Sequence, residues 1–401
     1  MDNAAPPQPQ RRKRVAVLGS TGSVGTSTLS LLENRGDRFE VVALAANGNA
    51  QALEAQCRRF APAAACLVQG GSRPSGLRAE TAWLTGSDGV LEALEASRPD
   101  LVLNAITGAA GLPASEWTLR AGKPLALANK ESLVMAGPYL VDLAKEHGAP
   151  ILPVDSEHCA IHQCLAGVRR EAVRKIYLTG SGGPFRMRPL DTFTAIRPDE
   201  ALVHPTWTMG PRITVGSATM MNKAFEIVEA RWLFDFEPEQ IDVVLHPQSI
   251  VHSMVELVDG SMLAQLGLPD MRVPILYCLA WPERLPFEFR PFDFARWRNL
   301  EFLPPQAERY PALALGYDVL KRGGDSGACL NAADEVLTAM FLAGEAAFPA
   351  ITDTVALVLR SRPARPIRRL SDVVAADAEA RQLARECAHS GQVNTRKGPM
   401  K

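Results

Sequence analysis

The sequence predicts an α/β protein that begins with a doubly wound parallel sheet, continues with a second α/β domain and ends in a helical domain. Two observations carry this prediction. Short apolar runs alternate with helix-like segments from Val15 to Asp155, and only helix-like segments remain after Ala312. Apolar strands that are separated by helices are typical of a parallel sheet covered on both faces. A length of 401 residues also exceeds one ordinary core, so two or three domains are expected.

The alternation gives the expected elements in order. The expected strands of the parallel sheet are Val15–Leu18, Phe39–Ala45, Ala65–Val68, Asp100–Ile106, Pro124–Ala128 and Pro150–Val154. The helices expected between them include Thr26–Asn34, Ala50–Arg59 and Val90–Ser97. The helices expected near the C-terminus are Ala312–Lys321, Ala328–Gly344, Ile351–Arg360 and Asp372–Ala388. The middle of the chain is dense in Gly, Ser, His, Met and Pro, which indicates a mixed α/β domain with long functional loops.

Composition and charge exclude several classes of partner. The formal net charge is −1, and a chain without a basic surplus is not expected to bind nucleic acid or an anionic membrane surface. No apolar run approaches the roughly 20 residues that a membrane-spanning helix needs. The seven cysteines form no CxxC pair, which favours reduced thiols over a disulfide framework. We therefore expect a cytoplasmic protein.

A glycine-rich turn follows the first expected strand. Gly19, Gly22 and Gly25 in the segment GSTGSVG permit a tight turn into a helix whose N-terminus attracts a pyrophosphate. An ordinary strand-to-helix turn is the alternative, but the position after the first strand favours a Rossmann-like dinucleotide site. The second strand ends in Asn47-Gly48-Asn49 without an acid, which favours NADP over NAD, although no basic residue lies in that loop. Asn129-Lys130-Glu131 follows a later strand, either beside the cofactor or as a solvated turn.

A pair of carboxylates follows the last strand of the sheet. Asp155 and Glu157 lie two residues apart in an extended segment, so their side chains project from one face. Two convergent carboxylates suit Mg²⁺ or Mn²⁺. One alternative is that these acids merely cap a helix and occupy its first turn. Another alternative is a zinc site that uses His158, His162 and the nearby cysteines.

Three later segments are also candidates for ligand binding. The consecutive glycines of Thr179–Pro184 form either an anion-binding nest or a simple turn. Trp207 lies in a loop bounded by Pro and Gly, which suggests a lid, although burial of its ring is the alternative. Asn222, Lys223 and Glu226 lie together at the start of an expected helix. One interpretation is that Asn222 and Lys223 hold a phosphate and Glu226 binds a metal ion. The alternative is that Lys223 and Glu226 form an ordinary ion pair on the surface.

Taken in order, these motifs resemble the family of 1-deoxy-D-xylulose 5-phosphate reductoisomerases. The resemblance runs from Val15 to about Ala388. Its most specific pieces are GSTGSVG (19–25), ANKESLV (128–134), LPVDSEH (152–158), SGGPFR (181–186), SATMMNK (217–223) and HPQSIVHS (246–253). The chain departs from the family at Thr206, where Asn is frequent, and at Gly216, where Asp is common.

The resemblance implies a role for each matching residue. The implied ligands of Mg²⁺, Mn²⁺ or Co²⁺ are Asp155, Glu157 and Glu226. The implied phosphate-holding residues are Ser181, Ser217, Asn222 and Lys223. The residues implied around the ketol portion of the substrate are Lys130, Ser156, Glu157 and His204, with Trp207 and Met209 on a closing flap. The cofactor contacts expected from the turn, the second strand and the resemblance are Gly19, Thr21, Gly22, Ser23, Val24, Gly25, Asn47, Asn49, Asn129, Glu131 and Gly210.

The implied reaction is the rearrangement of 1-deoxy-D-xylulose 5-phosphate and its reduction by NADPH to 2-C-methyl-D-erythritol 4-phosphate, a step toward isoprenoid precursors. Lys130, Glu157 or His204 would assist the chemistry, and a homodimer is implied. The expected division is an N-terminal arm (1–14), an NADPH-binding domain (15–155), a catalytic and metal-binding domain (156–281), a connector (282–311) and a helical domain (312–401). Two other functions stay open, namely an NADP-dependent dehydrogenase without rearrangement and a non-catalytic NADP-binding regulator.

Overall fold

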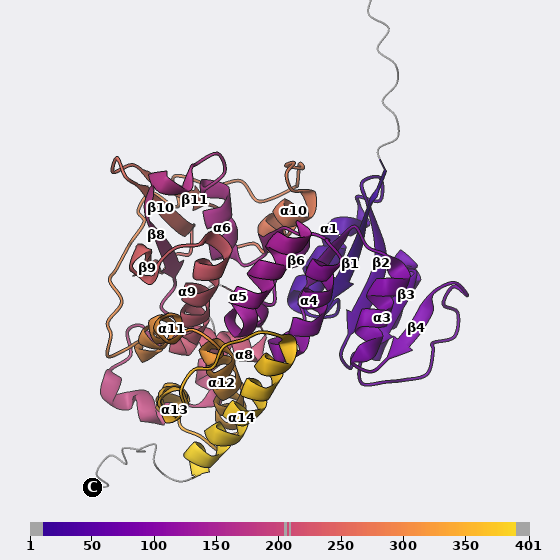
Figure 1. Cartoon of the computed structure of the whole chain (residues 1–401). Coiled ribbons are helices and arrows are strands. Elements are labelled where there is room, and N and C mark those ends of the chain that lie inside the picture. Colours follow the sequence, from indigo (N-terminus) through magenta and orange to yellow (C-terminus); the bar gives the residue numbers. More distant parts are fainter. Residues whose placement is uncertain (1–10, 204–206, 208–209, 390–401) are drawn as a thin grey trace, which may run out of the picture.

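The structure is a computed structural model that describes residues 11–203, residue 207 and residues 210–389. Figure 1 shows a parallel sheet formed by the N-terminal part of the chain, a second sheet formed by its middle and a group of helices formed by its C-terminal part. Within these described ranges, no helix is long and apolar enough to cross a membrane.

The N-terminal part forms one seven-stranded sheet in which every neighbouring pair of strands is parallel. Its strands are β1 (Lys13–Leu18), β2 (Phe39–Ala46), β3 (Ala64–Leu67), β4 (Ala82–Thr85), β5 (Leu101–Asn104), β6 (Leu125–Leu127) and β7 (Ile151–Pro153). The spatial order is β4-β3-β2-β1-β5-β6-β7, so the chain reverses its direction across the sheet between β1 and β5. Such a switch point is where ligands bind in open α/β sheets.

Helices cover both faces of this sheet, as the doubly wound prediction requires. They are α1 (Ser23–Glu33), α2 (Ala50–Phe60), α3 (Asp88–Ser97), α4 (Leu112–Arg120) and α5 (Lys130–His147). Alternate residues of a strand point to opposite faces. Accordingly, Val15 and Val17 of β1 belong to the core under α1 and α2, and Ala16 and Leu18 belong to the core under α3 and α4. The predicted doubly wound sheet is confirmed.

Two features of this region were not predicted. The edge strand β4 is only half-buried and lacks the long apolar run that marks the other strands. Helix α10 (Arg272–Ala280) follows the second sheet along the chain, yet its buried face packs on the N-terminal sheet through Ile275 and Leu279. The middle of the chain therefore returns to the N-terminal sheet and helps to enclose it.

The middle of the chain forms a mixed four-stranded sheet. Its strands are β8 (Val173–Gly180), β9 (Ile241–Leu245), β10 (Val251–Leu257) and β11 (Met262–Leu266). The spatial order is β11-β10-β8-β9, with β8 and β9 parallel and the other pairs antiparallel. One face of the sheet packs on α6 (Ser156–Cys164) and α9 (Met221–Phe234) through Ile161 and Ile227. This packing brings the start of α6 next to α9.

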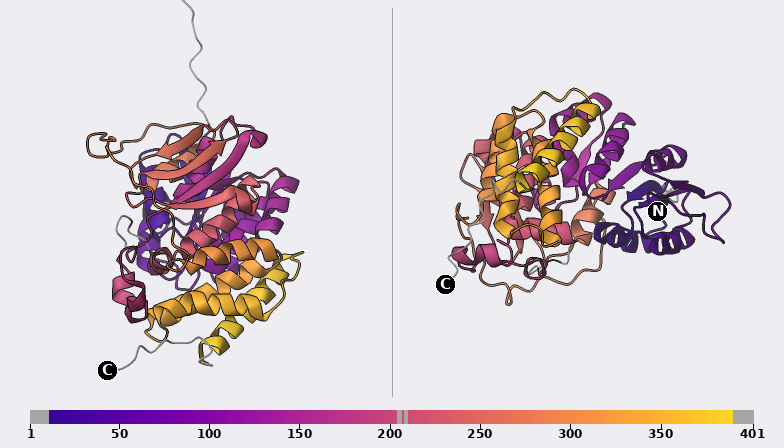
Figure 2. Two further views of the ribbon diagram at one scale, coloured as in Figure 1. Left: turned by 90° about the vertical axis from the view of Figure 1, so that its left-hand side faces the viewer. Right: turned by 90° about the horizontal axis from the view of Figure 1, so that it is seen from below.

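The C-terminal helices pack on the middle of the molecule, and Figure 2 shows them gathered on the side away from the N-terminal sheet. They are α11 (Pro311–Arg322), α12 (Ser326–Leu342), α13 (Phe348–Ser361) and α14 (Leu370–His389). Helix α12 is buried on most of its surface and packs on α5, α13 and α14. The shorter helices α7 (Pro198–Ala201) and α8 (Pro211–Thr219) lead from the second sheet into α9. Short 3₁₀ helices cover Gly108–Gly111, Arg170–Ala172, Leu190–Ala195 and Pro238–Gln240.

Candidate functional site

The glycine turn after β1 brings three backbone segments together. Gly19 has a φ angle of +74°, and a Cβ atom there would lie 2.4 Å from the carbonyl oxygen of Ala105. A Cβ atom on Gly25 would lie 2.3 Å from the carbonyl oxygen of Gly19. Only glycine fits at these positions, because the chain after β5 and the first turn of α1 both contact the loop. No side chain caps the N-terminus of α1 at Gly22, so its backbone N–H groups are available to an anion.

A cavity of about 250 Å³ opens in front of this turn. Its lining includes the following predicted cofactor residues: Gly22, Ser23, Val24, Glu131 and Gly210. Asn129 lies behind the cavity, where its side-chain amide donates to the carbonyl oxygens of Ile106 and Gly108 and ties the two loops together. Asn49 caps α2 by accepting a hydrogen bond from the backbone N–H of Ala52. This loop at the end of β2, with Asn47, does not line the cavity.

The carboxylates of Asp155, Glu157 and Glu226 converge. One oxygen atom from each lies within 4.8 Å of the others. Asp155 also caps α6, since its Oδ1 accepts a hydrogen bond of 3.1 Å from the backbone N–H of Glu157. Capping and convergence are therefore properties of one carboxylate rather than alternatives. Glu226 arrives from α9 and is fully buried.

Two lysines lie among the three acids. Lys130 Nζ donates to Asp155 Oδ2 at 2.7 Å and to Glu226 Oε1 at 3.4 Å. Lys223 Nζ donates to Glu157 Oε1 at 3.1 Å and to the second oxygen of Glu226. Burial alone would lower the pKa of Lys130, but Asp155 and Glu226 raise it well above its usual value. Burial raises the pKa of Glu226 to about 7.

This balance of charge fits a divalent cation. Three carboxylates and two ammonium groups are packed together in a largely buried place, and a cation that binds several carboxylates at once would stabilise such a concentration of acids. The donors are hard oxygen atoms, which suit Mg²⁺ or Mn²⁺. The zinc alternative is not supported, because His162 turns away from the acids and places Nδ1 2.7 Å from the hydroxyl of Tyr277.

Asp155 and Glu157 open onto a second cavity of about 410 Å³, whereas the predicted substrate and metal residue Glu226 is fully buried and does not line it. The predicted substrate residues in its lining are Lys130, Ser156, Glu157, Ser181, Trp207, Ser217, Asn222 and Lys223. Ser23, Val24 and Lys130 line this substrate cavity and the cofactor cavity alike, so the two adjoin. His204, Thr206 and Met209 lie outside the described residues.

The glycines between β8 and the substrate cavity allow a close approach of two loops. A Cβ atom on Gly183 would lie 2.7 Å from the carbonyl oxygen of Ser217, and Gly183 has a φ angle of +68°. This approach lets Ser181 and Ser217, which belong to different segments, line the same cavity. The sequence identified both segments but contained no sign that they touch.

The site also contains residues to which the sequence analysis assigned no role. Ser249 and His252 line the substrate cavity from the segment that begins β10, and the ring centroid of His252 lies 6.4 Å from that of Trp207. Asp270 lines the same cavity from the loop before α10. The polar motif HPQSIVHS was a usable signal for the first two. No signal marked Asp270.

A further ionic group, the Arg212 cluster, borders the cofactor cavity, and Arg212, Glu131 and Asp334 help to line that cavity. Arg212 Nη1 donates to Glu131 Oε1 at 2.6 Å and to Glu335 Oε1 at 2.9 Å. Arg212 Nη2 donates to Asn331 Oδ1 at 2.8 Å and lies 3.5 Å from Asp334 Oδ2. Burial raises the pKa of Asp334 to about 6. The cluster joins α8 to α5 and α12.

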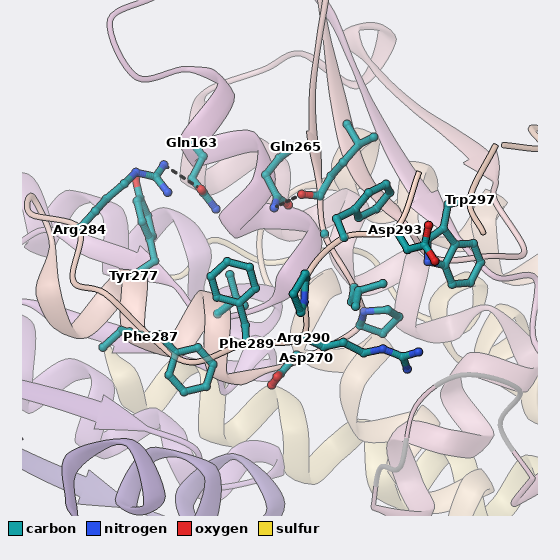
Figure 3. A pocket seen from close by; sticks show the side chains of 18 of the residues that line it. Gln163, Gln265, Asp270, Tyr277, Arg284, Phe287, Phe289, Arg290, Asp293 and Trp297 are labelled. Atoms are coloured by element: carbon teal, nitrogen blue, oxygen red, sulfur yellow. Dashed lines mark hydrogen bonds between the residues drawn. The ribbon is translucent and has the colours of Figure 1, made fainter. Parts of the chain in front are cut away.

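The largest of these cavities, about 880 Å³, lies elsewhere. Figure 3 shows it between the segment 284–297 and the region of β11 and α10, with Phe287, Phe289 and Trp297 among its side chains. Arg284 donates to Gln163 Oε1 at 2.9 Å across one end of it. Neither group of converging metal-binding side chains found in the described part of the chain lies in this cavity. Convergent chemistry, rather than volume, therefore identifies the candidate active site as the smaller pair of cavities.

The glycine turn of a dinucleotide site adjoins a group of carboxylates and a pocket with candidate phosphate-binding residues. This arrangement defines a metal-dependent, nicotinamide-dependent enzyme. Comparison with known proteins makes the class specific. Three models of 1-deoxy-D-xylulose 5-phosphate reductoisomerase domains match the chain: the reductoisomerase model at residues 15–137 and two C-terminal domain models at residues 151–234 and 266–383. The chain therefore belongs to the 1-deoxy-D-xylulose 5-phosphate reductoisomerase family.

Individual relatives agree with this assignment. The 1-deoxy-D-xylulose 5-phosphate reductoisomerase of Anaeromyxobacter sp. (strain K) is 47% identical over 382 residues, which cover 93% of this chain and 96% of the relative. The Zymomonas mobilis reductoisomerase solved in complex with NADPH has a TM-score of 0.87 and 41% identity, with 95% of this chain and all of the other covered. A DOX-P reductoisomerase solved with NADPH, fosmidomycin and magnesium has a TM-score of 0.87 and 36% identity, with coverages of 95% and 99%.

Proposed function

We propose that this chain converts 1-deoxy-D-xylulose 5-phosphate to 2-C-methyl-D-erythritol 4-phosphate with NADPH and a divalent metal ion. The observation that carries the proposal is the convergence of three carboxylates, two of which line a cavity that adjoins the cofactor cavity. A dehydrogenase that only transferred hydride would have no need of such a centre. The family assignment and the relatives solved with NADPH and magnesium support the same activity.

Asp155, Glu157 and Glu226 are the proposed metal ligands. Mg²⁺, Mn²⁺ or Co²⁺ bound there would polarise the carbonyl and hydroxyl oxygens of the substrate. The chain itself orients these acids, because the N-terminus of α6 holds Asp155 and α9 holds Glu226. Lys130 and Lys223 keep the acids together when no ion is bound.

The substrate phosphate is proposed to bind at the wall of the cavity formed by Ser181, Ser217, Asn222 and Lys223. Lys223 supplies a positive charge, since Glu157 and Glu226 raise the pKa of its ammonium group against the effect of burial. The two serine hydroxyls and the amide of Asn222 supply neutral donors. An arrangement of one cation and several neutral donors suits a phosphate monoester.

Lys130 and Glu157 are proposed to act at the ketol portion of the substrate, together with Ser156 and His204. The raised pKa of Lys130 keeps its ammonium group protonated, so Lys130 can donate a hydrogen bond to a substrate oxygen and does not serve as a base. Ser156 donates from its hydroxyl to Glu157, which orients that carboxylate. Trp207 lines the cavity, where its ring would exclude water from the bound substrate.

NADPH supplies the hydride of the reduction step when it is bound. Its pyrophosphate is proposed to bind at the N-terminus of α1, over Gly19, Thr21, Gly22, Ser23, Val24 and Gly25. Glu131 and Gly210 would contact the cofactor from the opposite wall, and Asn129 would hold that wall in place. Asn47 and Asn49 lie at the end of β2, where the adenosine ribose is expected.

A homodimer in the cytoplasm completes the proposal. Strand β11 is at one edge of the second sheet, and its exposed residues include Met262 and Leu266. An edge strand with exposed apolar side chains favours pairing with another strand. The seven cysteines are all free thiols, which supports a reducing compartment. Light scattering would check the dimer, for which twice the chain mass of 43.4 kDa is expected.

The activity is tested by mixing purified protein with NADPH, Mn²⁺ and 1-deoxy-D-xylulose 5-phosphate and following NADPH absorbance. We expect oxidation of NADPH that requires both the sugar phosphate and the metal, and that stops when a chelator is added. The product is identified by mass and NMR as the branched sugar alcohol phosphate. Folded protein that oxidises no NADPH under these conditions, or that does so equally well with the chelator, would contradict the proposal.

A further inference from the structure

A second group of titratable side chains lies behind the metal centre. His158 in α6 and Glu229 in α9 are both buried, and with Asp155 they form a set whose ligand atoms lie within 4.8 Å of one another. Neither His158 nor Glu229 lines the substrate cavity or the cofactor cavity. The proposed roles of the active-site residues leave both of them unexplained.

His158 links two of the proposed metal ligands from behind. Its Nδ1 lies 3.2 Å from Asp155 Oδ1, and its Nε2 lies 3.0 Å from the backbone carbonyl oxygen of Glu226. Each ring nitrogen therefore faces an oxygen atom that can accept a hydrogen bond. Asp155 Oδ1 faces His158, whereas Asp155 Oδ2 faces Lys130 on the cavity side. The ring therefore holds Asp155 by the oxygen atom that does not point toward the cavity.

Glu229 lies one helical turn after Glu226 and faces the same ring. Glu229 Oε2 lies 3.9 Å from His158 Nδ1, and in the described part of the chain this buried oxygen has no hydrogen-bond partner. A buried acid costs free energy unless a nearby opposite charge offsets it. His158 is the basic side chain that faces this oxygen, and the same ring contacts Asp155. The two residues thus depend on each other.

A second metal ion is a poor explanation of this group. His158 is fully buried, and both of its ring nitrogens already face oxygen atoms. Phe234 stacks on the ring at a centroid distance of 6.1 Å and closes one side. A pair that is enclosed in this way can hold a ligand in position, but it offers an ion neither an entry nor a free ring nitrogen.

We propose that Glu229 and His158 form a buried pair that positions Asp155 for metal binding, with Glu229 acting through His158. This inference rests on the proposed metal-dependent function. The pair joins the start of α6 to α9, the two helices that carry the three proposed metal ligands. Partners that orient a metal ligand typically change metal affinity by about 10–100-fold when they are removed.

The test measures Mn²⁺ binding to the full chain by electron paramagnetic resonance titration. We expect Glu229→Gln and His158→Gln each to weaken Mn²⁺ binding by about tenfold or more. Because the two residues act as one unit, the double variant is expected to bind Mn²⁺ about as tightly as the single variant with the lower Mn²⁺ affinity. NADPH affinity and the melting temperature are expected to stay close to those of the wild type. Glu239→Gln, on the exposed surface, is the matched control.

Four outcomes would overturn the proposal. Unchanged Mn²⁺ affinity in Glu229→Gln would remove its positioning role, and additive losses in the double variant would show that Glu229 does not act through His158. Parallel losses of Mn²⁺ binding, NADPH binding and melting temperature would mean that the pair supports only the fold. Two Mn²⁺ ions per wild-type chain, with one lost in Glu229→Gln, would make the pair a second metal site. Wild-type protein that binds no Mn²⁺ would instead contradict the proposed function.

Discussion

Two groups of charged side chains lie along α8 and α9, and they use their charges differently. In the metal centre, three carboxylates converge within 4.8 Å at the edge of a cavity, with Lys130 and Lys223 between them. In the Arg212 cluster, one guanidinium is shared by Glu131 from α5 and by Asp334 and Glu335 from α12. Both groups contain three acids, so the number of acids does not separate a metal centre from a group that joins helices.

The difference is in how the acids are held apart. A guanidinium has donors in a rigid planar fork and can bond several acceptors at fixed angles. Arg212 therefore separates its acids and fastens three helices to one another. A lysine ammonium is a compact charge on a flexible chain, and a bound cation can take its place among acids that converge. Convergent acids with lysine counter-charges, open to a cavity, indicate chemistry.

The largest effect is expected from a change in the metal centre. Asp155→Asn removes one negative ligand and should lower turnover by a factor on the order of 10³, because metal polarisation contributes several kcal/mol. NADPH affinity should stay nearly intact, since Asp155 does not line the cofactor cavity. Steady-state kinetics and NADPH fluorescence titration check both expectations. The exposed Asp142→Asn serves as the control, and a wild-type rate in Asp155→Asn would remove Asp155 from the metal site.

A change in the Arg212 cluster should give the opposite result. Arg212→Met leaves Glu131 and Asp334 as buried acids without their cation, and the free energy of unfolding should fall by on the order of 3 kcal/mol. Mn²⁺ affinity should change little, because Arg212 does not line the substrate cavity. Urea unfolding and Mn²⁺ titration measure the two effects.

Arg174→Met is the matched control for this change. It breaks an ion pair with Glu256 in which the arginine is largely exposed, and such pairs contribute about 1 kcal/mol or less. If Arg212→Met were no less stable than Arg174→Met, the cluster would not fasten the helices. If Arg212→Met lost Mn²⁺ binding while it remained folded, the proposed separation of the two groups would be wrong.

Much of the fold could be predicted from the sequence because it depends on local patterns. The apolar runs of β1 and β2 and the glycine turn after β1 are continuous in the chain, so their spacing alone indicates a parallel sheet and a switch-point site. The edge strand β4 and the placement of α10 on the N-terminal sheet depend on packing between distant segments. The spacing of apolar residues and the identity of turn residues carry no information about such packing.

The candidate site likewise has a part that the sequence predicts and a part that it does not. Asp155 and Glu157 form a pair that is visible in the sequence, and the order of the motifs adds Glu226 through the family resemblance. The Arg212 cluster has no such sign, since Arg212 and Glu335 are 123 residues apart and neither belongs to a recognisable motif. In the sequence, helix capping and metal binding are alternatives for Asp155, whereas in the fold its two oxygen atoms face different partners. Residue types predict candidates, and contacts between segments decide how each atom is used.

The smallest effect is expected from Asp334, whose ionised form lowers the free energy of unfolding because the carboxylate is buried in the Arg212 cluster. Burial raises its pKa to about 6, and Arg212 only partly opposes that rise. The folded chain therefore holds the Asp334 proton more tightly than the unfolded chain, in which the pKa is near 3.8. Wild-type stability from this group is highest at low pH and is lost as the pH rises through 6.

Asp334→Asn removes this dependence because asparagine does not titrate. Relative to the wild type, the unfolding free energy of the variant should rise by about 1 kcal/mol between pH 5 and pH 8. Urea unfolding of both proteins at the two pH values measures the difference, and the exposed Asp37→Asn should show no such change. A difference that is constant or that falls with pH would mean that Arg212 fully compensates the buried acid. The cluster would then resemble a balanced ion pair, and its contrast with the metal centre would be sharper than the pKa of Asp334 suggests.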